Sequence, residues 1–210
     1  LGRLDIAIFG SAILGTIPQV LLAFRTAYPE VKIVLHTMTK GEQIEALRQR
    51  RITAGFNRML SPLPEIASEL VTMETLLLAI NENHPLAGQA EISFRMLADN
   101  PLVLFPAAAR PNFVDKVMGL CQEMGFVPEV AQVVGDAVTG VALVASGFGV
   151  CLVPESATVL ALPGVVYRPI ADLPEHARVD LSCIYRADDQ SPLLAAFLDT
   201  VRALRDSARS

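Results

Sequence analysis

Phe9-Gly10-Ser11-Ala12-Ile13-Leu14-Gly15-Thr16-Ile17-Pro18 is the stretch that decides the predicted fold. The mostly apolar run 4–8 before it is short enough for a buried strand. Beyond it, apolar residues recur with helical spacing over 17–28, Thr16 can cap that helix, and Pro18 suits its first turn. The sequence therefore predicts a strand, a tight loop and a helix N-terminus, a geometry that offers backbone N–H groups to a small anion. Because every strand–helix unit has such a loop, this motif alone does not indicate a binding site.

Bulk composition sets limits on the class of protein. The chain has 210 residues, 52% of them hydrophobic, which suits one large or two small domains that bury roughly 70% of the unfolded surface. Its 17 basic and 22 acidic residues give a net charge of −5. The basic cluster Arg48-Gln49-Arg50-Arg51 is expected at a helix C-terminus, where cations are favourable anyway. We therefore expect no nucleic-acid binding by this chain alone.

The cysteines and the chain start indicate the compartment. Cys121, Cys151 and Cys183 are odd in number, widely spaced and in apolar contexts, so we expect reduced core residues of a cytoplasmic protein. No signal peptide and no uninterrupted apolar run near 18 residues is present, so no contact with a membrane is expected. The chain opens in a strand pattern without an initiator methionine, and we expect a fragment of a longer protein.

Strand and helix patterns alternate along the rest of the chain, which favours an α/β class with mainly parallel sheets. The predicted strands are 4–8, 31–37, 52–56, 70–80, 101–106, 130–134, 150–153, 165–170 and 179–185. The predicted helices are 17–28, 39–50, 93–97, 113–125, 137–146, 156–160 and 192–205. The helix at 39–50 begins with Thr39-Lys40-Gly41-Glu42, a capping-box pattern.

Two long connections predict two lobes joined by two crossover strands. One is the apolar stretch 70–80, taken as a single strand, and the other lies near 173–179. Ligands of such proteins bind where carboxyl ends of strands face each other. We therefore expect the loops 10–16, 38–41, 106–113 and 135–139 to surround one cleft.

With these loops placed, the sequence resembles the effector-binding domain of LysR-type transcriptional regulators over about residues 3–205. The family-wide features are Phe9-Gly10-Ser11 and 145–154, Ala-Ser-Gly-Phe-Gly-Val-Cys-Leu-Val-Pro. Three further motifs are similar to the subgroup that controls catechol, chlorocatechol and benzoate breakdown, whose inducers are cis,cis-muconate and its chlorinated forms. They are Met38-Thr39-Lys40-Gly41-Glu42-Gln43, Ala54-Gly55-Phe56-Asn57-Arg58, and Phe105-Pro106 with Arg110-Pro111-Asn112-Phe113.

The resemblance implies a periplasmic-binding-protein type 2-like fold with two Rossmann-like lobes. Lobe I would comprise 1–73 plus 178–210 and lobe II 74–177. It also implies a DNA-binding domain and a linker helix upstream of this chain, a homodimer and, in the full-length protein, a tetramer that acts on promoter DNA and RNA polymerase. The apolar stripe of the first helix, which Leu22, Ala23 and Ala27 widen, also favours a dimer.

The resemblance also implies which residues contact the effector. Ser11 and its neighbours would form the first anion-binding loop and Thr39, or Lys40 if the alignment slips by one, the second. Asp136 precedes the small apolar contact Ala137. The full implied set is Gly10, Ser11, Ala12, Thr39, Lys40, Arg58, Pro111, Asn112, Phe113, Asp136 and Ala137. The loop Ala107-Ala108-Ala109 departs from the more polar loops of the subgroup.

A muconate-type inducer is a flat, unsaturated dicarboxylate, and neutral donors are sufficient to bind it. One carboxylate would lie at Ser11 and the other at the Thr39 cap, with Phe113 and Ala137 covering the diene. Arg58 either pairs with Asp136 beside the site or contacts the ligand, and the sequence does not decide between them. The 38–43 motif can equally be only a capped helix.

Other classes of function have weaker support. His36, His84 and His176 lack metal-ligand spacing, the cysteines form no CxxC, and 10–15 lacks the G-x-G-x-x-G order, so no cofactor or metal is expected. Glu74 on the crossing stretch is either a hinge ion pair or a buried functional carboxylate. An enzyme on the same fold would need a nucleophile–base pair, and none is apparent. The main alternative is a solute-binding protein of a transport system, which shares the two-lobed design.

Overall fold

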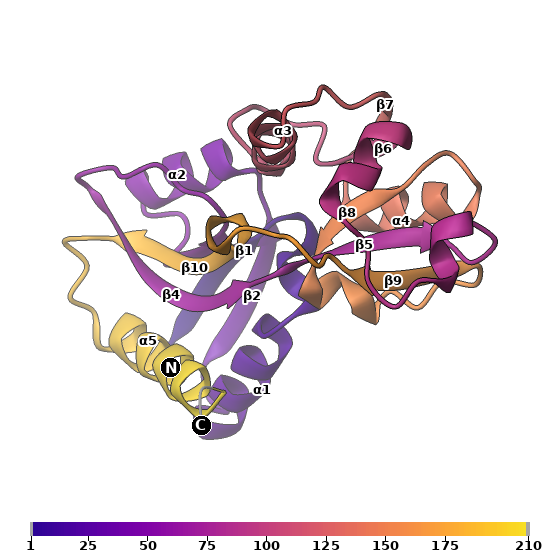
Figure 1. The fold of residues 1–210 in the computed structure, drawn as a ribbon. Coiled ribbons are helices and arrows are strands. Elements are labelled where there is room, and N and C mark those ends of the chain that lie inside the picture. The colour runs from indigo at the N-terminus through magenta and orange to yellow at the C-terminus, as the bar shows by residue number, and fades with distance from the viewer. Residues whose placement is uncertain (1, 209–210) are drawn as a thin grey trace. The chain divides into compact units, whose positions relative to one another are not determined.

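The chain folds into two units, and residues 2–208 are described in a computed structural model (Figure 1). Unit 1 comprises Leu1–Met73 and Asp180–Ser210, and unit 2 comprises Glu74–Val179. The chain therefore passes between the units twice. Among residues 2–208, no helix combines the length and apolar character that a membrane crossing requires.

Unit 1 is built on a five-stranded sheet in the order β2-β1-β3-β10-β4. Its strands are β1 (Arg3–Ile8), β2 (Lys32–Thr37), β3 (Ala54–Asn57), β4 (Ile66–Glu74) and β10 (Val179–Arg186). Strand β1 runs parallel to both β2 and β3, whereas β10 runs antiparallel to β3. Strand β10 begins at the edge where β1, β2 and β3 end, since Ser182 pairs with Asn57.

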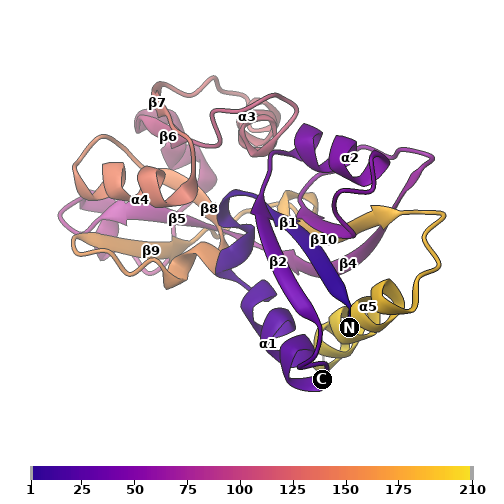
Figure 2. The ribbon, with the colours of Figure 1, turned by 180° about the vertical axis from the view of Figure 1, so that it is seen from behind.

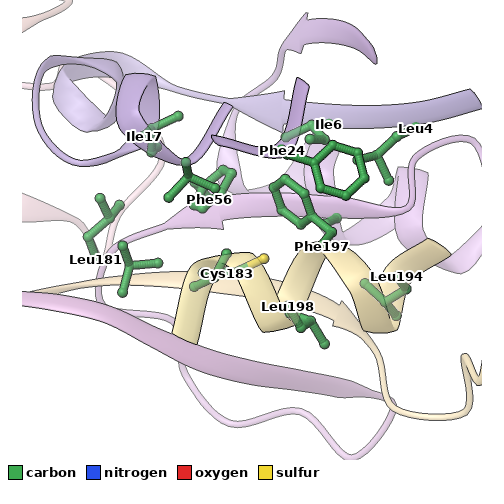
Figure 3. Packing of buried hydrophobic residues seen from close by; sticks show 14 of the residues in the cluster. Leu4, Ile6, Ile17, Phe24, Phe56, Leu181, Cys183, Leu194, Phe197 and Leu198 are labelled. Atoms are coloured by element: carbon green, nitrogen blue, oxygen red, sulfur yellow. The ribbon is translucent and has the colours of Figure 1, made fainter. Parts of the chain in front are cut away.

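Helices cover both faces of this sheet, with α1 (Ile17–Ala27) and α5 (Pro192–Ser207) on one side and α2 (Lys40–Arg48) on the other (Figures 1 and 2). Alternate residues of a strand point to opposite faces, so in β1 Leu4 and Ile6 are buried on the α1/α5 side. Phe197 of α5 packs edge-on against Phe24 and Phe56, with ring centroids 5.4 and 6.1 Å apart (Figure 3).

Unit 2 contains two smaller sheets. The first has the order β8-β5-β9 and is antiparallel throughout, and the second is the parallel pair β6-β7. Its strands are β5 (Leu76–Asn81), β6 (Leu102–Leu104), β7 (Val130–Val133), β8 (Cys151–Pro154) and β9 (Val165–Pro169). Its α-helices are α3 (Phe113–Glu123) and α4 (Ala137–Ala145). Within the described residues, both units also contain short 3₁₀ segments, which are η1 (Gly10–Leu14), η2 (Pro85–Gly88), η3 (Phe94–Asp99), η4 (Glu155–Val159) and η5 (Glu175–Ala177).

Three local expectations from the sequence are wrong. The stretch 70–80 is two strands, because the chain leaves the sheet of unit 1 after Glu74 and pairs with β8 and β9 from Leu76 onward. The sheets are mixed rather than mainly parallel, since β10 pairs antiparallel with β3, and β8 and β9 pair antiparallel with β5. The loop after β1 contains η1, and Thr16 at the α1 N-cap makes no side-chain capping bond.

Candidate functional site

Three loops of unit 1 meet at one edge of its sheet. In the parallel register Ile8 pairs with Thr37 and Ala7 with Gly55, so β1, β2 and β3 end at the same level. The backbone N–H of Met38 continues this register by donating to the carbonyl oxygen of Ile8 at 3.0 Å. The carboxyl edge of parallel strands is where α/β proteins bind ligands. Of the predicted site residues, the structure places Gly10, Ser11, Ala12, Thr39, Lys40 and Arg58 on these loops.

The first loop, after β1, presents a hydroxyl group. Gly10 has φ +60, the left-handed region that glycine adopts without a steric penalty, and this turn brings Ser11 into η1. Ser11 is partly exposed, and within residues 2–208 its hydroxyl makes no hydrogen bond, so it can donate to a ligand. Ala12 is only 3% exposed and belongs to the hydrophobic core of unit 1. It anchors the loop and cannot supply a side-chain contact.

The second loop forms the predicted capping box at the start of α2. The backbone N–H of Glu42 donates to Thr39 Oγ1 at 3.3 Å, and the backbone N–H of Thr39 donates to Glu42 Oε1 at 3.2 Å. That second bond lowers the pKa of Glu42. Because Thr39 Oγ1 already accepts one bond, its hydroxyl hydrogen is what a ligand can use. Lys40 Nζ donates to the carbonyl oxygen of Met59 at 3.1 Å and so joins the second loop to the third.

The third loop, after β3, is fixed by the first residue of the returning segment of unit 1. Arg58 Nη1 donates to the carbonyl oxygen of Asp180 at 3.3 Å, and the backbone N–H of Met59 donates to Asp180 Oδ1 at 2.8 Å. Met59 has φ +55, which is uncommon for a residue with a side chain. Two cationic side chains, Lys40 and Arg58, are therefore tied to the same short loop.

The buried side-chain amide of Gln43 joins the second and third loops. Gln43 is fully buried, and its Nε2 donates to the carbonyl oxygens of Met38 at 3.0 Å and Phe56 at 3.3 Å. Its Oε1 accepts from Asn57 Nδ2 at 2.7 Å. A Cβ at Gly55 would lie 2.3 Å from that oxygen, so the glycine makes room for the amide. This network anchors the loops that carry Thr39, Lys40 and Arg58.

Sequence reasoning missed these supporting residues. Gln43, Gly55 and Asn57 stand inside the two motifs that carry the family resemblance, but their types and spacing do not show that the Gln43 amide is buried against Gly55. Asp180 offered no local signal, because its partner Met59 is 121 residues away in sequence.

In unit 2, Asn112 builds the loop that enters α3. Its Oδ1 accepts from the backbone N–H of Val114 at 2.8 Å, its Nδ2 donates to the carbonyl oxygen of Ala108 at 3.1 Å, and its backbone N–H donates to Asp115 at 2.8 Å. Asn112 is only 8% exposed. These bonds make Asn112 a loop-forming residue, and Pro111 before it is exposed.

The aromatic and acidic residues predicted in unit 2 also have local roles. Phe113 is buried at the start of α3 and stacks on Phe105 with ring centroids 5.3 Å apart. Asp136 caps α4, since its Oδ1 accepts from the backbone N–H of Thr139 at 2.8 Å, and Ala137 begins α4 and is 1% exposed. The pairing of Arg58 with Asp136 stays a prediction.

The loops of unit 2 also share one edge. Strands β6 and β7 run parallel, and the backbone N–H of Ala107 donates to the carbonyl oxygen of Val134 at 2.7 Å. The loop that carries Asn112 and Phe113 therefore adjoins the loop that carries Asp136. Within residues 2–208, no cluster of His, Cys, Asp or Glu could hold a metal ion.

Comparison with known proteins places this arrangement in a family. A family model described as "LysR substrate binding domain" matches residues 1–206. The chain belongs to this family. The LysR domain is 37% identical over 202 residues to the HTH-type transcriptional regulator TfdS of Cupriavidus pinatubonensis, a match that covers 96% of the chain and 68% of TfdS. The predicted family is thereby confirmed.

Solved structures have the same fold as this LysR domain. The BenM effector binding domain with its effector benzoate has a TM-score of 0.90 and 29% sequence identity, covering 99% of this chain and 93% of that one. Full-length CbnR complexed with its target DNA has a TM-score of 0.89 and 34% identity, covering 97% and 71%. The predicted two-lobed α/β fold class is therefore confirmed.

The histidines and Glu74 make hydrogen-bond or ion-pair contacts with neighbouring residues, and the three cysteines are buried. His36 Nε2 lies 2.8 Å from Asp5 Oδ1, His84 Nε2 lies 2.8 Å from Asn100 Oδ1, and His176 contacts Glu123. Glu74 is buried, and its Oε1 accepts from the backbone N–H of Ser156 at 2.8 Å. Cys121, Cys151 and Cys183 are free and buried.

Proposed function

We propose that this LysR domain senses a small carboxylate of aromatic-compound breakdown and belongs to a transcription regulator rather than an enzyme. The observation that carries the proposal is the carboxyl edge of unit 1. Hydroxyls of Ser11 and Thr39 stand there with the α2 N-terminus and with two cations, Lys40 and Arg58, on adjoining loops. Charge-assisted hydrogen bonds from such donors favour a carboxylate over a neutral ligand.

The effector class we propose is a muconate or chloromuconate. A dicarboxylate can use the Ser11 loop and the Thr39 cap together, because both lie at one sheet edge. BenM, whose structure holds benzoate as its effector, supports aromatic acids as the competing class. That Asn112, Phe113 and Ala137 of unit 2 also contact the effector stays a prediction.

A homodimer is part of the proposal, and a groove beside α1 supports it. The groove measures about 690 Å³ and lies between α1 and the edge strand β2, with Leu21, Leu22, Tyr28, Ile33 and Leu35 among its lining residues. Leu22 is 69% and Leu35 46% exposed. The lining also contains the polar residues Arg25, Thr26 and Lys32, and exposed leucines in a mixed groove beside an unpaired strand edge are typical of a surface that another chain covers. We assign it to a second copy of this chain.

The action on DNA is proposed for the whole protein. Full-length CbnR, which shares the fold, was solved with its target DNA, and TfdS is named as a transcriptional regulator. We propose that effector binding favours one arrangement of the dimer or tetramer and so changes its contacts with promoter DNA and RNA polymerase. A ligand can do this only by binding the two arrangements with different affinity. Such a protein works in the cytoplasm. The same relatives favour a regulator over a solute-binding transport protein.

Isothermal titration calorimetry of the chain tests the effector class. The panel is cis,cis-muconate, 2-chloromuconate, benzoate, catechol and succinate. Saturable binding of a muconate, with succinate and catechol silent, is the expected result. Binding of benzoate alone would replace the dicarboxylate by an aromatic acid, and silence from all five would contradict the proposed effector class.

A further inference from the structure

One residue of the returning segment controls the loop after β3. This loop, called here the 58–60 loop, contains Met59 in the left-handed region at φ +55. A residue with a side chain holds this conformation only where its surroundings fix it. The fixing contact is the hydrogen bond of 2.8 Å from the backbone N–H of Met59 to Asp180 Oδ1.

The carboxylate of Asp180 is itself held in place. Ser182 Oγ donates to Asp180 Oδ2 at 2.7 Å, and Ser182 is the residue of β10 that pairs with Asn57 at the end of β3. Asp180 is partly buried, so solvent competes less for its oxygens than at the surface. The two oxygens therefore join the end of β3, the 58–60 loop and the start of β10.

The same loop sets the position of both cations. Lys40 Nζ donates to the carbonyl oxygen of Met59 at 3.1 Å, and Arg58 Nη1 donates to the carbonyl oxygen of Asp180 at 3.3 Å. If the backbone of Met59 turns, its carbonyl oxygen moves away from Lys40. A change at Asp180 thus reaches Lys40 and Arg58 although its carboxylate contacts neither in these bonds.

We infer that Asp180 is a positioning residue that holds Lys40 and Arg58 in register for a carboxylate ligand, an assignment that rests on the proposed function. Because Asp180 is the first residue of unit 1 after the chain returns from unit 2, it joins the binding edge to the second connection between the units. Asn at this position keeps an acceptor for the N–H of Met59 and a donor for the Ser182 hydroxyl. Ala keeps neither.

Amine labelling tests the inference without any effector. The chain has three lysines, Lys32, Lys40 and Lys116, so limited acetylation read by peptide mass spectrometry follows each separately. Lys32, exposed in the single chain, is the internal reference, and because it lines the groove assigned to a second copy, all variants are labelled at the same chain concentration. We expect Lys40 in Asp180→Ala to react several-fold faster relative to Lys32, and Asp180→Asn to match the wild type. Equal labelling of Lys40 in the wild type and in folded Asp180→Ala would overturn the inference.

If Asp180→Ala does not fold, Asp180→Ser is used instead. The serine side chain is one atom shorter than that of aspartate, so its hydroxyl does not reach the backbone N–H of Met59.

A glycine rescue separates positioning from general damage. Glycine adopts the left-handed region freely, so Met59→Gly in the Asp180→Ala background should return Lys40 labelling part of the way to the wild-type rate. A purely structural defect at Asp180 would not be relieved by removing a second side chain. No recovery in the double variant would therefore contradict a role that works through the Met59 backbone.

Ligand binding supplies the second readout. Titration with cis,cis-muconate and benzoate should show about tenfold weaker binding for Asp180→Ala and near wild-type binding for Asp180→Asn, as expected when charge-assisted bonds lose their geometry. Unchanged affinity in Asp180→Ala with increased Lys40 labelling would remove Lys40 from the effector contacts and overturn the positioning role. If the wild type binds neither acid, the proposed effector class fails, while Lys40 labelling still decides whether Asp180 positions the loop.

Discussion

Gly55→Ala is the sharpest test of the buried network under the binding edge. The new methyl group would lie 2.3 Å from Gln43 Oε1 and 3.1 Å from its Cδ. Real Cβ contacts stay beyond 3.0 Å, so the amide must move by at least about 0.7 Å. The bond of 2.7 Å from Asn57 Nδ2 to Gln43 Oε1 then stretches or breaks, and so do the bonds from Gln43 to the backbone.

The expected loss of stability follows from these contacts. A buried polar group left without its partner costs about 1–3 kcal/mol, while Gly→Ala at a compatible position gains about 0.4–1 kcal/mol through the unfolded state. A net loss of about 2 kcal/mol corresponds to a fall in Tm of about 4–8 °C for a chain of this size. Urea and thermal unfolding followed by circular dichroism measure both quantities.

Two controls make the test specific. Gly41→Ala is the matched control, because a Cβ there meets nothing within 4 Å on the exposed start of α2, and we expect no loss of stability. In a Gln43→Ala background the clash is absent, so Gly55→Ala should cost almost nothing further. An equal loss in both backgrounds, or wild-type stability of the single Gly55→Ala variant, would refute the reasoning.

Further predictions address binding, assembly, reactivity and acid stability. Ser11→Ala should weaken effector binding by about 1–3 kcal/mol in calorimetry, the range for losing a hydrogen bond to a charged group. Leu22→Glu should shift the chain from dimer to monomer in sedimentation, because it places a charge in the groove beside α1. Burial raises the pKa of Cys151 to about 12, so at pH 8 its thiol should react with a disulfide reagent only after unfolding. The hydrogen bond from Arg202 holds the pKa of Glu69 below its usual value, so its stabilising effect is present above the unfolded-state pKa and is lost as the pH falls through the folded-state pKa. Unfolding free energies measured down to pH 3 should therefore decline less steeply for Glu69→Gln.

Local chemistry made part of the site predictable from the sequence. The capping box joins Thr39 and Glu42, which are three positions apart, so it could be predicted from the two residue types and their spacing. The strand–loop–helix order around Ser11 was likewise readable from apolar spacing, although the η1 turn was not, because short 3₁₀ turns have no strong sequence signature. The direction of β10 depends on where the chain re-enters the sheet, which is a property of the whole topology.

Contacts over long sequence separations explain what remained hidden. Asn57 of one motif donates a hydrogen bond to Gln43 of another motif. The backbone N–H of Met59 donates to Asp180, which lies 121 residues away in the sequence. Such partners have no periodicity, and an acid or amide at these positions looks the same as one on the surface. The predicted site residues came from the family resemblance, which concerns expected effector contacts, so it did not indicate the residues that hold the loops in place.

Under the proposed function, the polar groups at the carboxyl edge of unit 1 differ in what holds them in place. Ser11 and Thr39 offer hydroxyl hydrogens on loops set by backbone geometry, so their positions change little with side-chain substitution elsewhere. Lys40 instead donates to the carbonyl oxygen of Met59, Arg58 donates to that of Asp180, and Asp180 in turn holds the backbone of Met59. We therefore expect the hydroxyls to favour any carboxylate, and we expect discrimination between one acid and another to depend on where the cations are held. Selectivity for the effector should then respond to substitutions in the 58–60 loop and at the start of β10, where no residue needs to contact the ligand.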